Sequence, residues 1–479
     1  MIGRTLDDLE VVIEHPRRRL AIVAAISAAG SALEAAVLVI IARVGLGLDS
    51  GNTSIVIAGF TASLLQWVLL GCGFLAALAV GHLAFARAAS RFSADVLTSS
   101  RDRLVDAHLS ASFARKSADA EGELQHAAGT LSEQSAYLAL TVAVGGASLA
   151  NVGVLVIVSA LVSPAATAGI AALGVALFVV LKPIATMTSR AAARFVESNA
   201  VFGSTVAEQS QIALETQLFG VEETRSTQIA QRSNDAGSEL TRSRFISLAG
   251  GAAFRDIALL ALLAGLALVV ATDRLGIEAI GPVLVLNVRA LSFAQAVQST
   301  RQVVSEHAPN LESVAAKIRS YRTEPRTTGQ IELDRLGTIR FTNVSFRYSG
   351  ADHAAIRDAD LTFVDRSSYG VVGPSGGGKS TLSQLLLGVR PPTSGEIWVG
   401  DQRLDEIDPH SWARLVSAVP QDARLIEGSI ADNVRFFRPD IGDDAVVEAL
   451  RSAGVLDDVL AFPDGIERRV SARSAGLSG

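Results

Sequence analysis

The chain has few of the residues that disulfide-rich, nucleic-acid-binding or ordinary soluble proteins use. One cysteine, Cys72, in 479 residues excludes an intrachain disulfide and a cysteine-rich zinc site. Charged residues make up 19% of the chain, below the roughly one quarter that soluble domains carry. Only four of the 42 basic residues are lysines, and the net charge of −6 argues against a nucleic-acid partner. The 49% hydrophobic content argues against disorder.

Charge is missing altogether from stretches that are long enough to cross a membrane. The sequence has 37 uncharged residues after Asp49 and 48 after Glu133, where a Ser-Pro pair at 163–164 predicts a hairpin turn. A membrane-spanning helix needs about 20 mostly apolar residues, and buried soluble helices rarely give such runs. We therefore predict six membrane-spanning helices. They cover residues 20–42, 55–86, 134–161, 165–186, 246–272 and 279–303.

The basic residues give these helices an orientation. Arginines cluster before the first span, after the second and after the fourth, while the opposite loops contain Arg274 as their single basic residue. Because loops rich in lysine and arginine stay on the cytoplasmic side, we expect both termini in the cytoplasm of a multi-pass plasma-membrane protein. The inner connections, residues 87–133 and 182–244, are polar with few helix breakers. This composition predicts helices that continue beyond the membrane.

The second half has a different composition. Residues 311–322 are a charged helical stretch, and residues 323–330 (TEPRTTGQ) have the composition of a linker. Short β-like runs follow within residues 331–350 and 361–373, ahead of a glycine-rich loop. The predicted fold class is an all-α polytopic membrane domain over residues 1–322, followed by a partial α/β P-loop NTPase domain over residues 331–479.

The glycine-rich loop GPSGGGKST fits the phosphate-binding pattern G-x-x-x-x-G-K-[ST]. Glycines let the backbone curl so that several N–H groups face one phosphate chain, while Lys379 neutralises phosphate charge and Ser380 ligates Mg²⁺. We expect a strand at Tyr369–Val372 before the loop and a helix at Ser380–Gly388 after it. The predicted cofactors are ATP and Mg²⁺. The predicted phosphate-binding residues are Gly373, Pro374, Ser375, Gly376, Gly377, Gly378, Lys379, Ser380 and Thr381.

Six spans, long inner connections and a C-terminal P-loop domain together resemble a half-transporter of the ATP-binding cassette (ABC) exporter family. Tyr348, in FRYSG, is placed like the aromatic residue that stacks on adenine in that family, although alone it could be a strand-end tyrosine. Gln421, in VPQDARLIEG, resembles the family's Q-loop glutamine, a Mg²⁺ ligand, although alone it could be a surface glutamine. Leu477, Ser478 and Gly479 resemble the opening of the family's signature motif. GELQHAAG at 122–129 and QLFGVEETR at 217–225 resemble its inner-loop regions.

The resemblance implies a dimer in a lipid membrane. Each ATP would lie between the P-loop of one half-transporter and the signature motif of an identical or related half. In the family the Walker B strand, the catalytic glutamate and the switch histidine follow the signature motif, and we identify none of them in the chain. We therefore predict no catalytic residue within residues 1–479. We expect a truncated half of an ABC-type ATPase that is inactive alone, or alternatively a hydrolysis-dead nucleotide-binding membrane regulator.

Two charged residues lie inside predicted spans. Glu34 is midway along the first span and Arg289 lies within the sixth. Charges at such depth are costly and usually face a cavity or a partner. They could form a structural pair, or Arg289 could meet an anionic head group in a substrate cavity. The sequence does not identify the transported substrate.

Overall fold

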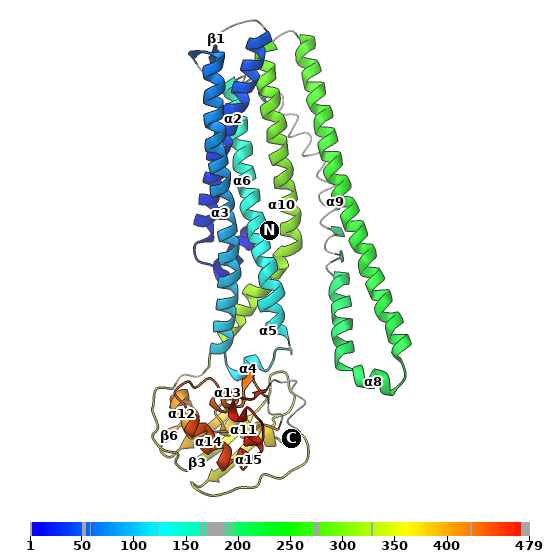
Figure 1. Ribbon diagram of the computed structural model, residues 1–479. Helices are drawn as coiled ribbons and strands as arrows, with labels where there is room; N and C mark the ends of the chain where they lie inside the picture. The colour runs from blue at the N-terminus through cyan, green and yellow to red at the C-terminus, as the bar shows by residue number, and fades with distance from the viewer. Residues whose placement is uncertain are drawn as a thin grey trace. The chain divides into compact units, whose positions relative to one another are not determined.

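The computed structural model describes residues 2–49, 54–57, 59–120, 122–162, 197–272, 277–326, 329–421 and 424–470, with single positions between 164 and 195. The chain folds as two units, Met1–Arg326 and Thr327–Gly479. The first contains the long helices and the second contains the larger sheet (Figure 1).

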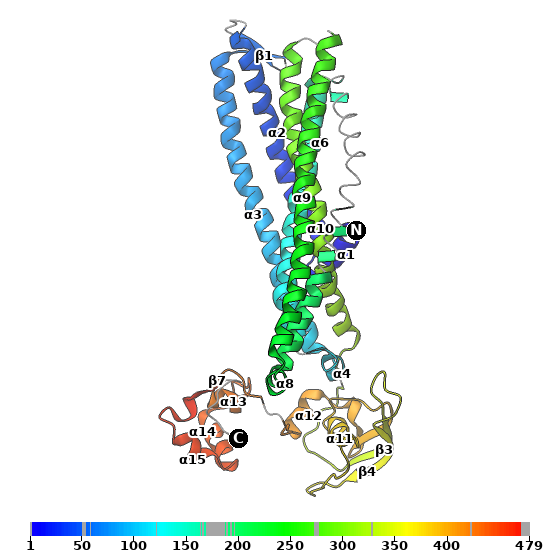
Figure 2. The same ribbon diagram turned by 90° about the vertical axis from the view of Figure 1, so that its right-hand side faces the viewer.

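The first unit is built on four long helices and one short amphipathic helix. The long helices α2, α3, α6 and α10 run alongside one another (Figures 1 and 2). α3 begins at a capping box, in which Ser63 and Gln66 each accept a hydrogen bond from the backbone N–H of the other. The helices are α1 (Ile2–Val12), α2 (Pro16–Asp49), α3 (Leu64–Ser110), α4 (Phe113–Lys116), α5 (Glu123–His126), a π-helical turn (Ala127–Leu131), α6 (Ser132–Val162), α8 (Ala213–Leu218), α9 (Glu222–Thr272) and α10 (Ile277–Thr323).

The largest apolar core of this unit joins α1 to α3, α6 and α10. Leu9 and Val12 of α1 are fully buried in it. Two polar contacts fix the same helix, because Arg319 pairs with Asp8 at 2.7 Å and Arg103 donates to the Val11 carbonyl at 2.9 Å. The short N-terminal helix is therefore part of the bundle.

Three of the described helices are long and apolar enough to cross a membrane: Pro16–Gly45, Leu64–Ser110 and Glu123–Val162. The predicted spans 20–42 and 134–161 lie inside the first and the third. The predicted spans 246–272 and 279–303 are helical, within α9 and α10, but that they cross the membrane stays a prediction. The predicted span 165–186 lies almost entirely outside the described residues.

The predicted start of the second span at residue 55 is wrong. Residues 54–63 form a β-hairpin of β1 (Ser54–Ile57) and β2 (Phe60–Ser63), with Gly59 at a φ of 85° between them. The β-branched run of β1 favours a strand, and the Trp67 indole N–H binds the hairpin through the Ile55 carbonyl at 3.2 Å. Absence of charge cannot distinguish this hairpin from a helix.

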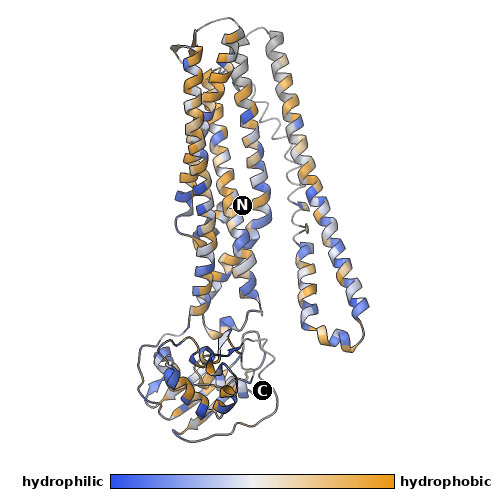
Figure 3. Cartoon of the chain, in the orientation of Figure 1, coloured by the Kyte–Doolittle hydropathy of each residue, from blue (hydrophilic) through white to orange (hydrophobic). Residues whose placement is uncertain are grey.

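The long helices continue beyond their apolar parts, as the composition of the inner connections predicts. α3 extends to Ser110, α9 begins at Glu222, and α10 runs on through the charged stretch at 311–322. Figure 3 shows the change from hydrophobic to hydrophilic colouring along these helices. Single helices thus connect the apolar region to the polar ends of the first unit.

The second unit contains a four-stranded antiparallel sheet in the order β4-β3-β5-β6. α11 lies beside the sheet (Figure 2), and its Leu382 and Leu385 share an apolar core with Phe341 and Ile397. A second core forms around Ile430, Val446 and Val470. The strands are β3 (Ile339–Phe346), β4 (Ile356–Phe363), β5 (Ser394–Val399), β6 (Gln402–Arg403), β7 (Gly428–Ser429) and β8 (Arg469–Val470). The helices are α11 (Lys379–Leu386), α12 (Pro409–Leu415), α13 (Ile430–Arg435), α14 (Asp443–Ser452) and α15 (Leu456–Leu460), with 3₁₀ turns at Leu404–Glu406 and Gly465–Glu467.

The predicted strand at Tyr369–Val372 does not form. Among the residues that the structure describes, no strand lies beside it to complete its backbone hydrogen bonds, and Val372 is 93% exposed. A strand exists only with neighbours, so an apolar run alone was an insufficient signal. The helix predicted at Ser380–Gly388 does form, as α11, and Gly388 follows it with a φ of 64°.

Candidate nucleotide site and membrane pocket

The glycine-rich loop adopts a conformation that requires glycine. Gly376 and Gly378 have φ values of 77° and 81°, where side chains are strained. A Cβ at Gly378 would lie 2.5 Å from the Ala355 carbonyl oxygen. The loop closes through the Gly377 N–H, which donates to the Pro374 carbonyl at 3.1 Å. The sequence therefore builds a tight turn directly before α11.

Lys379 is bound by the loop itself. Its ammonium group donates to the carbonyl oxygens of Gly373 at 2.9 Å and Pro374 at 2.7 Å. A phosphate chain bound in the loop would replace these two carbonyls as the acceptor of the Lys379 N–H groups. Because Lys379 is the first residue of α11, the positive end of that helix faces the same place. The structure thus puts an ammonium group and a helix N-terminus together, as the motif predicts.

Tyr348 lies against the same helix. Its hydroxyl is 3.0 Å from the Thr381 hydroxyl, and the edge of Phe346 contacts its ring. The Arg390 guanidinium lies 5.1 Å from the ring centre, and Gln384 accepts a hydrogen bond from Arg390 Nε at 2.7 Å. Arg390 could not be predicted from the sequence, because no local pattern marks a residue that follows the helix by four positions. Tyr348 therefore sits next to the P-loop with a cation beside its ring.

The other predicted nucleotide contacts are not brought together. Gln421 is exposed, and whether it reaches the P-loop stays a prediction. Leu477, Ser478 and Gly479 lie outside the described residues. No group of three or more His, Cys, Asp or Glu side chains that could hold a metal was found in the described part of the chain. Ser380 is exposed at the start of α11, which fits a Mg²⁺ ion held mainly by phosphate oxygens.

A polar cluster that joins α4 and the segment after it to the end of α10 was not predicted. The Asp119 carboxylate accepts hydrogen bonds from Arg115 at 2.8 Å, Lys317 at 3.2 Å and the Tyr321 hydroxyl. Burial acts to raise the pKa of Asp119, but the hydrogen bonds from Tyr321 and Lys317 and the nearby positive charges lower it overall. Burial and the hydrogen bond to Asp119 raise the pKa of Tyr321. The one sequence signal for this cluster is that Lys116 and Lys317, two of only four lysines, lie near it.

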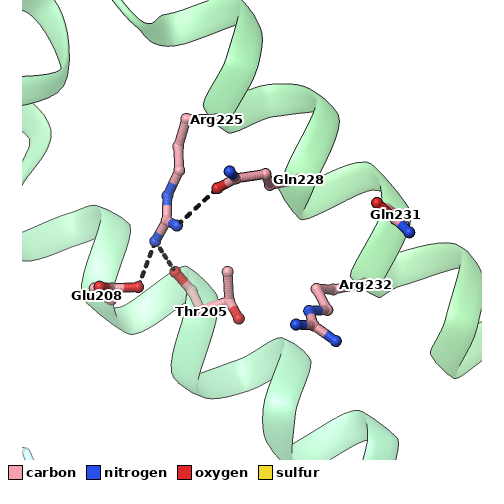
Figure 4. A pocket seen from close by; sticks show the side chains of 6 residues that line it. All are labelled: Thr205, Glu208, Arg225, Gln228, Gln231 and Arg232. Carbon is pink, nitrogen blue, oxygen red and sulfur yellow. Dashed lines mark hydrogen bonds and ion pairs between the residues drawn. The ribbon is translucent and has the colours of Figure 1, made fainter. Parts of the chain in front are cut away.

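A second polar arrangement braces the tip of the hairpin that contains α8. Arg225 binds the Glu208 carboxylate at 2.6 Å, the Thr205 carbonyl at 3.3 Å and Gln228 at 3.3 Å (Figure 4). Arg232 lines the other side of the same pocket of about 410 Å³. Arg225 is the last residue of the stretch QLFGVEETR. This inner-loop region is therefore held by side-chain contacts as well as by helix formation.

Glu34 and Arg289 do meet inside the bundle. The Glu34 carboxylate accepts a hydrogen bond from Arg289 Nε in an ion pair. Both residues line a pocket of about 180 Å³ between α2, α3, α6 and α10. Of the two alternatives that the sequence left open, the pairing is present, and it borders a cavity.

Comparison with known proteins identifies the second unit. Residues 356–479 match the family model of the ABC transporter domain. The chain is 36% identical over 143 residues to human ATP-binding cassette sub-family B member 6, covering 30% of this chain and 17% of that protein. It is 34% identical over 170 residues to the mitochondrial iron-sulfur clusters transporter ATM1 of Chaetomium globosum, covering 36% and 27%. It is 32% identical over 176 residues to the ABC multidrug transporter mdr2 of Aspergillus fumigatus, covering 35% and 22%.

These matches span at most about a quarter of each relative's length, 27% in the ATM1 comparison. They agree with the P-loop geometry of the second unit. The chain thus combines an N-terminal helical region, in which three described helices are apolar enough to cross a membrane, with a C-terminal ABC transporter domain whose family match covers residues 356–479.

Proposed function

We propose that the chain is one half of a dimeric ABC exporter that uses ATP to export or flip a substrate across the plasma membrane. The observation that supports this most strongly is the P-loop, in which Gly378 permits the turn and Lys379 lies at the start of α11. The similarity to transporters of the same domain type agrees with it.

In this proposal the nucleotide is held by the second unit. The backbone N–H groups of Gly373 and of residues 375–378 and the Lys379 ammonium would bind the phosphates, and Ser380 with Gln421 would ligate Mg²⁺. Mg²⁺ supplies charge neutralisation on the transferring phosphoryl group. Tyr348 would stack on the adenine, while its hydroxyl keeps the 3.0 Å hydrogen bond with the Thr381 hydroxyl. The signature residues Leu477, Ser478 and Gly479 would contact the nucleotide of the partner half.

Transport would follow from the continuity of the helices. α3 and α10 each run unbroken from the apolar region to the inner loops. A movement imposed at their inner ends would therefore be carried into the membrane region as rigid-body motion. This role requires both termini to lie in the cytoplasm, as the positive-inside pattern predicts.

A regulator that binds nucleotide without hydrolysing it is the second candidate. Both candidate functions require ATP binding, and only the exporter requires ATP hydrolysis. We expect residues 1–479 to bind ATP and not to hydrolyse it.

Binding of a fluorescent ATP analogue to purified protein in detergent tests the shared step. Lys379→Ala should weaken binding by about tenfold or more, since one charge-assisted contact contributes about 1.5–3 kcal/mol. Arg366→Ala is the matched control, because that side chain is 92% exposed in the same unit. Equal affinities for Lys379→Ala and the unmodified chain would reject nucleotide binding at this loop. ATP turnover that disappears in Lys379→Ala would reject the expectation that residues 1–479 are inactive.

A further inference from the structure

The pocket around Glu34 and Arg289 has a polar lining inside an apolar bundle. Ser27, Ser31 and Glu34 follow one another at spacings of four and three residues, which places them on one face of α2. Ser148 and Asn151 of α6 and Arg289 of α10 line the same pocket. All of these residues fall within predicted membrane spans. Polar groups at that depth are costly unless they bind one another or a ligand.

Most of these polar groups already bind one another. Ser27 and Asn151 are hydrogen-bonded at 3.0 Å, and the Ser148 hydroxyl donates to the Val144 carbonyl at 2.8 Å. The Ser31 hydroxyl is different. The residue is 3% exposed, and its oxygen is buried without a hydrogen-bond partner among the described residues. An unsatisfied buried hydroxyl costs about 1–3 kcal/mol, which a bound polar ligand would recover.

The Arg289 guanidinium is fixed on two sides and open on the third. Its Nε binds Glu34, and the Phe293 ring lies 4.8 Å from its central carbon. No hydrogen bond of its two terminal nitrogens is found within the described part of the chain. The Glu34 side chain is 15% exposed, whereas that of Arg289 is 43% exposed. The Glu34 carboxylate is thus the more buried partner of the pair, and the terminal N–H groups of Arg289 belong to the more exposed one.

We propose that this pocket binds an oxyanion, such as a phosphate or a carboxylate, on the fork of Arg289 with a third hydrogen bond from Ser31. Two parallel N–H donors match the spacing of two oxygens on one phosphorus or carbon atom. Glu34 is a positioning residue that holds Nε and leaves the fork free. His82 of α3 is the remaining titratable group of the lining, and it is exposed. A volume of about 180 Å³ admits a head group and excludes whole lipid chains.

That this oxyanion belongs to the exported cargo rests on the function proposed above, but its binding does not. The anion is either free in water or the head group of a lipid. Both sources present the same oxyanion, and protection of a cysteine from thiol labelling distinguishes them without ATP.

Thiol labelling tests the site, because Cys72 is the only cysteine. In a Cys72→Ser background, Val144→Cys places a reporter on the pocket lining, and Val144 is 37% exposed. The labelling rates of two methanethiosulfonate reagents are compared, one with a sulfonate and one with a trimethylammonium group. The anionic-to-cationic rate ratio should fall about tenfold on Arg289→Gln, as expected from one unit charge nearby. Leu161→Cys, at an 81% exposed position of α6, is the control and its ratio should not change.

Protection from a neutral methanethiosulfonate identifies the source of the anion. Protection by inorganic phosphate indicates a free oxyanion, and protection only by dihexanoyl phosphatidic acid indicates a lipid head group. Ser31→Ala should weaken the protection severalfold, and Arg289→Lys should keep the charge ratio but lose the protection. The labelling rate with the neutral reagent alone reports whether each variant is folded. The proposal would be overturned if Arg289→Gln left the anionic-to-cationic rate ratio unchanged, or if neither anion slowed labelling of the cysteine.

Discussion

Asp119 should be one of the most important polar residues for the stability of the first unit. Its side chain is 9% exposed, and it accepts hydrogen bonds from Arg115, Lys317 and Tyr321. Lys317 is itself 10% exposed and pairs also with Glu123. Through these contacts the segment after α4 is attached to the end of α10, about 200 residues away. The contacts therefore tie two distant parts of the chain together.

Asp119→Ala removes the carboxylate and leaves buried donors without acceptors. Breaking a buried ion pair from one side costs about 3–5 kcal/mol, whereas an exposed pair contributes about 0–1 kcal/mol. Because Lys317 still pairs with Glu123 in the variant, we expect Asp119→Ala to lower the free energy of unfolding by about 3 kcal/mol, at the lower end of that range. Asp119→Asn keeps an acceptor and should cost roughly half as much.

Pulse proteolysis in mixed micelles of detergent and dodecyl sulfate measures the fraction of unfolded protein. Asp7→Ala is the matched control, because it breaks an ion pair with Arg17 in which the side chains are 64% and 63% exposed. The free energies of unfolding of the two variants should differ by about 2 kcal/mol or more. If Asp119→Ala is as stable as Asp7→Ala, the cluster does not hold α4 to α10 and the reasoning is refuted.

The same cluster gives a pH dependence with a definite sign. The folded-state pKa of Asp119 is below its ordinary value, so the unfolded chain binds more protons in the acid range. The contribution of Asp119 is thus present above its unfolded-state pKa and is lost as the pH falls. Burial and the charge of Lys116 lower the pKa of His108 below 6.5, so His108 also destabilises the fold as the pH falls below that value. Asp119→Asn should remove the first part of the acid dependence and enlarge the second, because the charge of Asp119 acts to raise the pKa of His108.

Three further changes test other parts of the structure. Gly378→Ala, with a φ of 81° and an approach to backbone of 2.5 Å, should weaken binding of the fluorescent ATP analogue about tenfold or more, whereas Gly370→Ala, with open space around it, should not. Arg225→Gln should speed limited proteolysis of the α8 hairpin severalfold, because the ion pair at 2.6 Å is lost, and an unchanged cleavage rate would contradict this. Trp412→Phe should lower the free energy of unfolding of the second unit by about 1 kcal/mol, since its indole N–H donates to the Leu387 carbonyl at 3.1 Å, and chemical denaturation measures that loss.

The sequence could predict the features that depend on local signals. The P-loop, the apolar helices at 20–42 and 134–161, and the helical continuation of the inner connections are each encoded in a contiguous pattern, and the structure contains them. Predictions failed where a neighbour decides the structure. Residues 54–57 pair with 60–63, and residues 369–372 lack a described pairing strand, although both stretches are simply apolar in the sequence.

The candidate site was predictable to a similar extent. Lys379 and the glycines follow from spacing, and the placement of Tyr348 next to Thr381 agrees with the resemblance. The contact of Arg390 with Tyr348, in contrast, joins residues 42 positions apart through the packing of α11 on β3, which no local pattern reports. That Gln421 serves the same site stays a prediction.

The scarcity of lysine provides one more physical connection between sequence and structure. The three lysines in the described part of the chain each place a compact ammonium against oxygen acceptors: Lys379 on two loop carbonyls, Lys317 on two carboxylates and Lys116 on the Leu109 carbonyl. A guanidinium spreads its donors over three nitrogens in one plane, whereas an ammonium directs three donors from one atom. At Lys379 and at Lys317 that single atom reaches two oxygen acceptors. Lys317→Arg keeps the charge but places a larger planar group where the lysine side chain is 10% exposed, so it should lower the free energy of unfolding of the first unit, which pulse proteolysis measures.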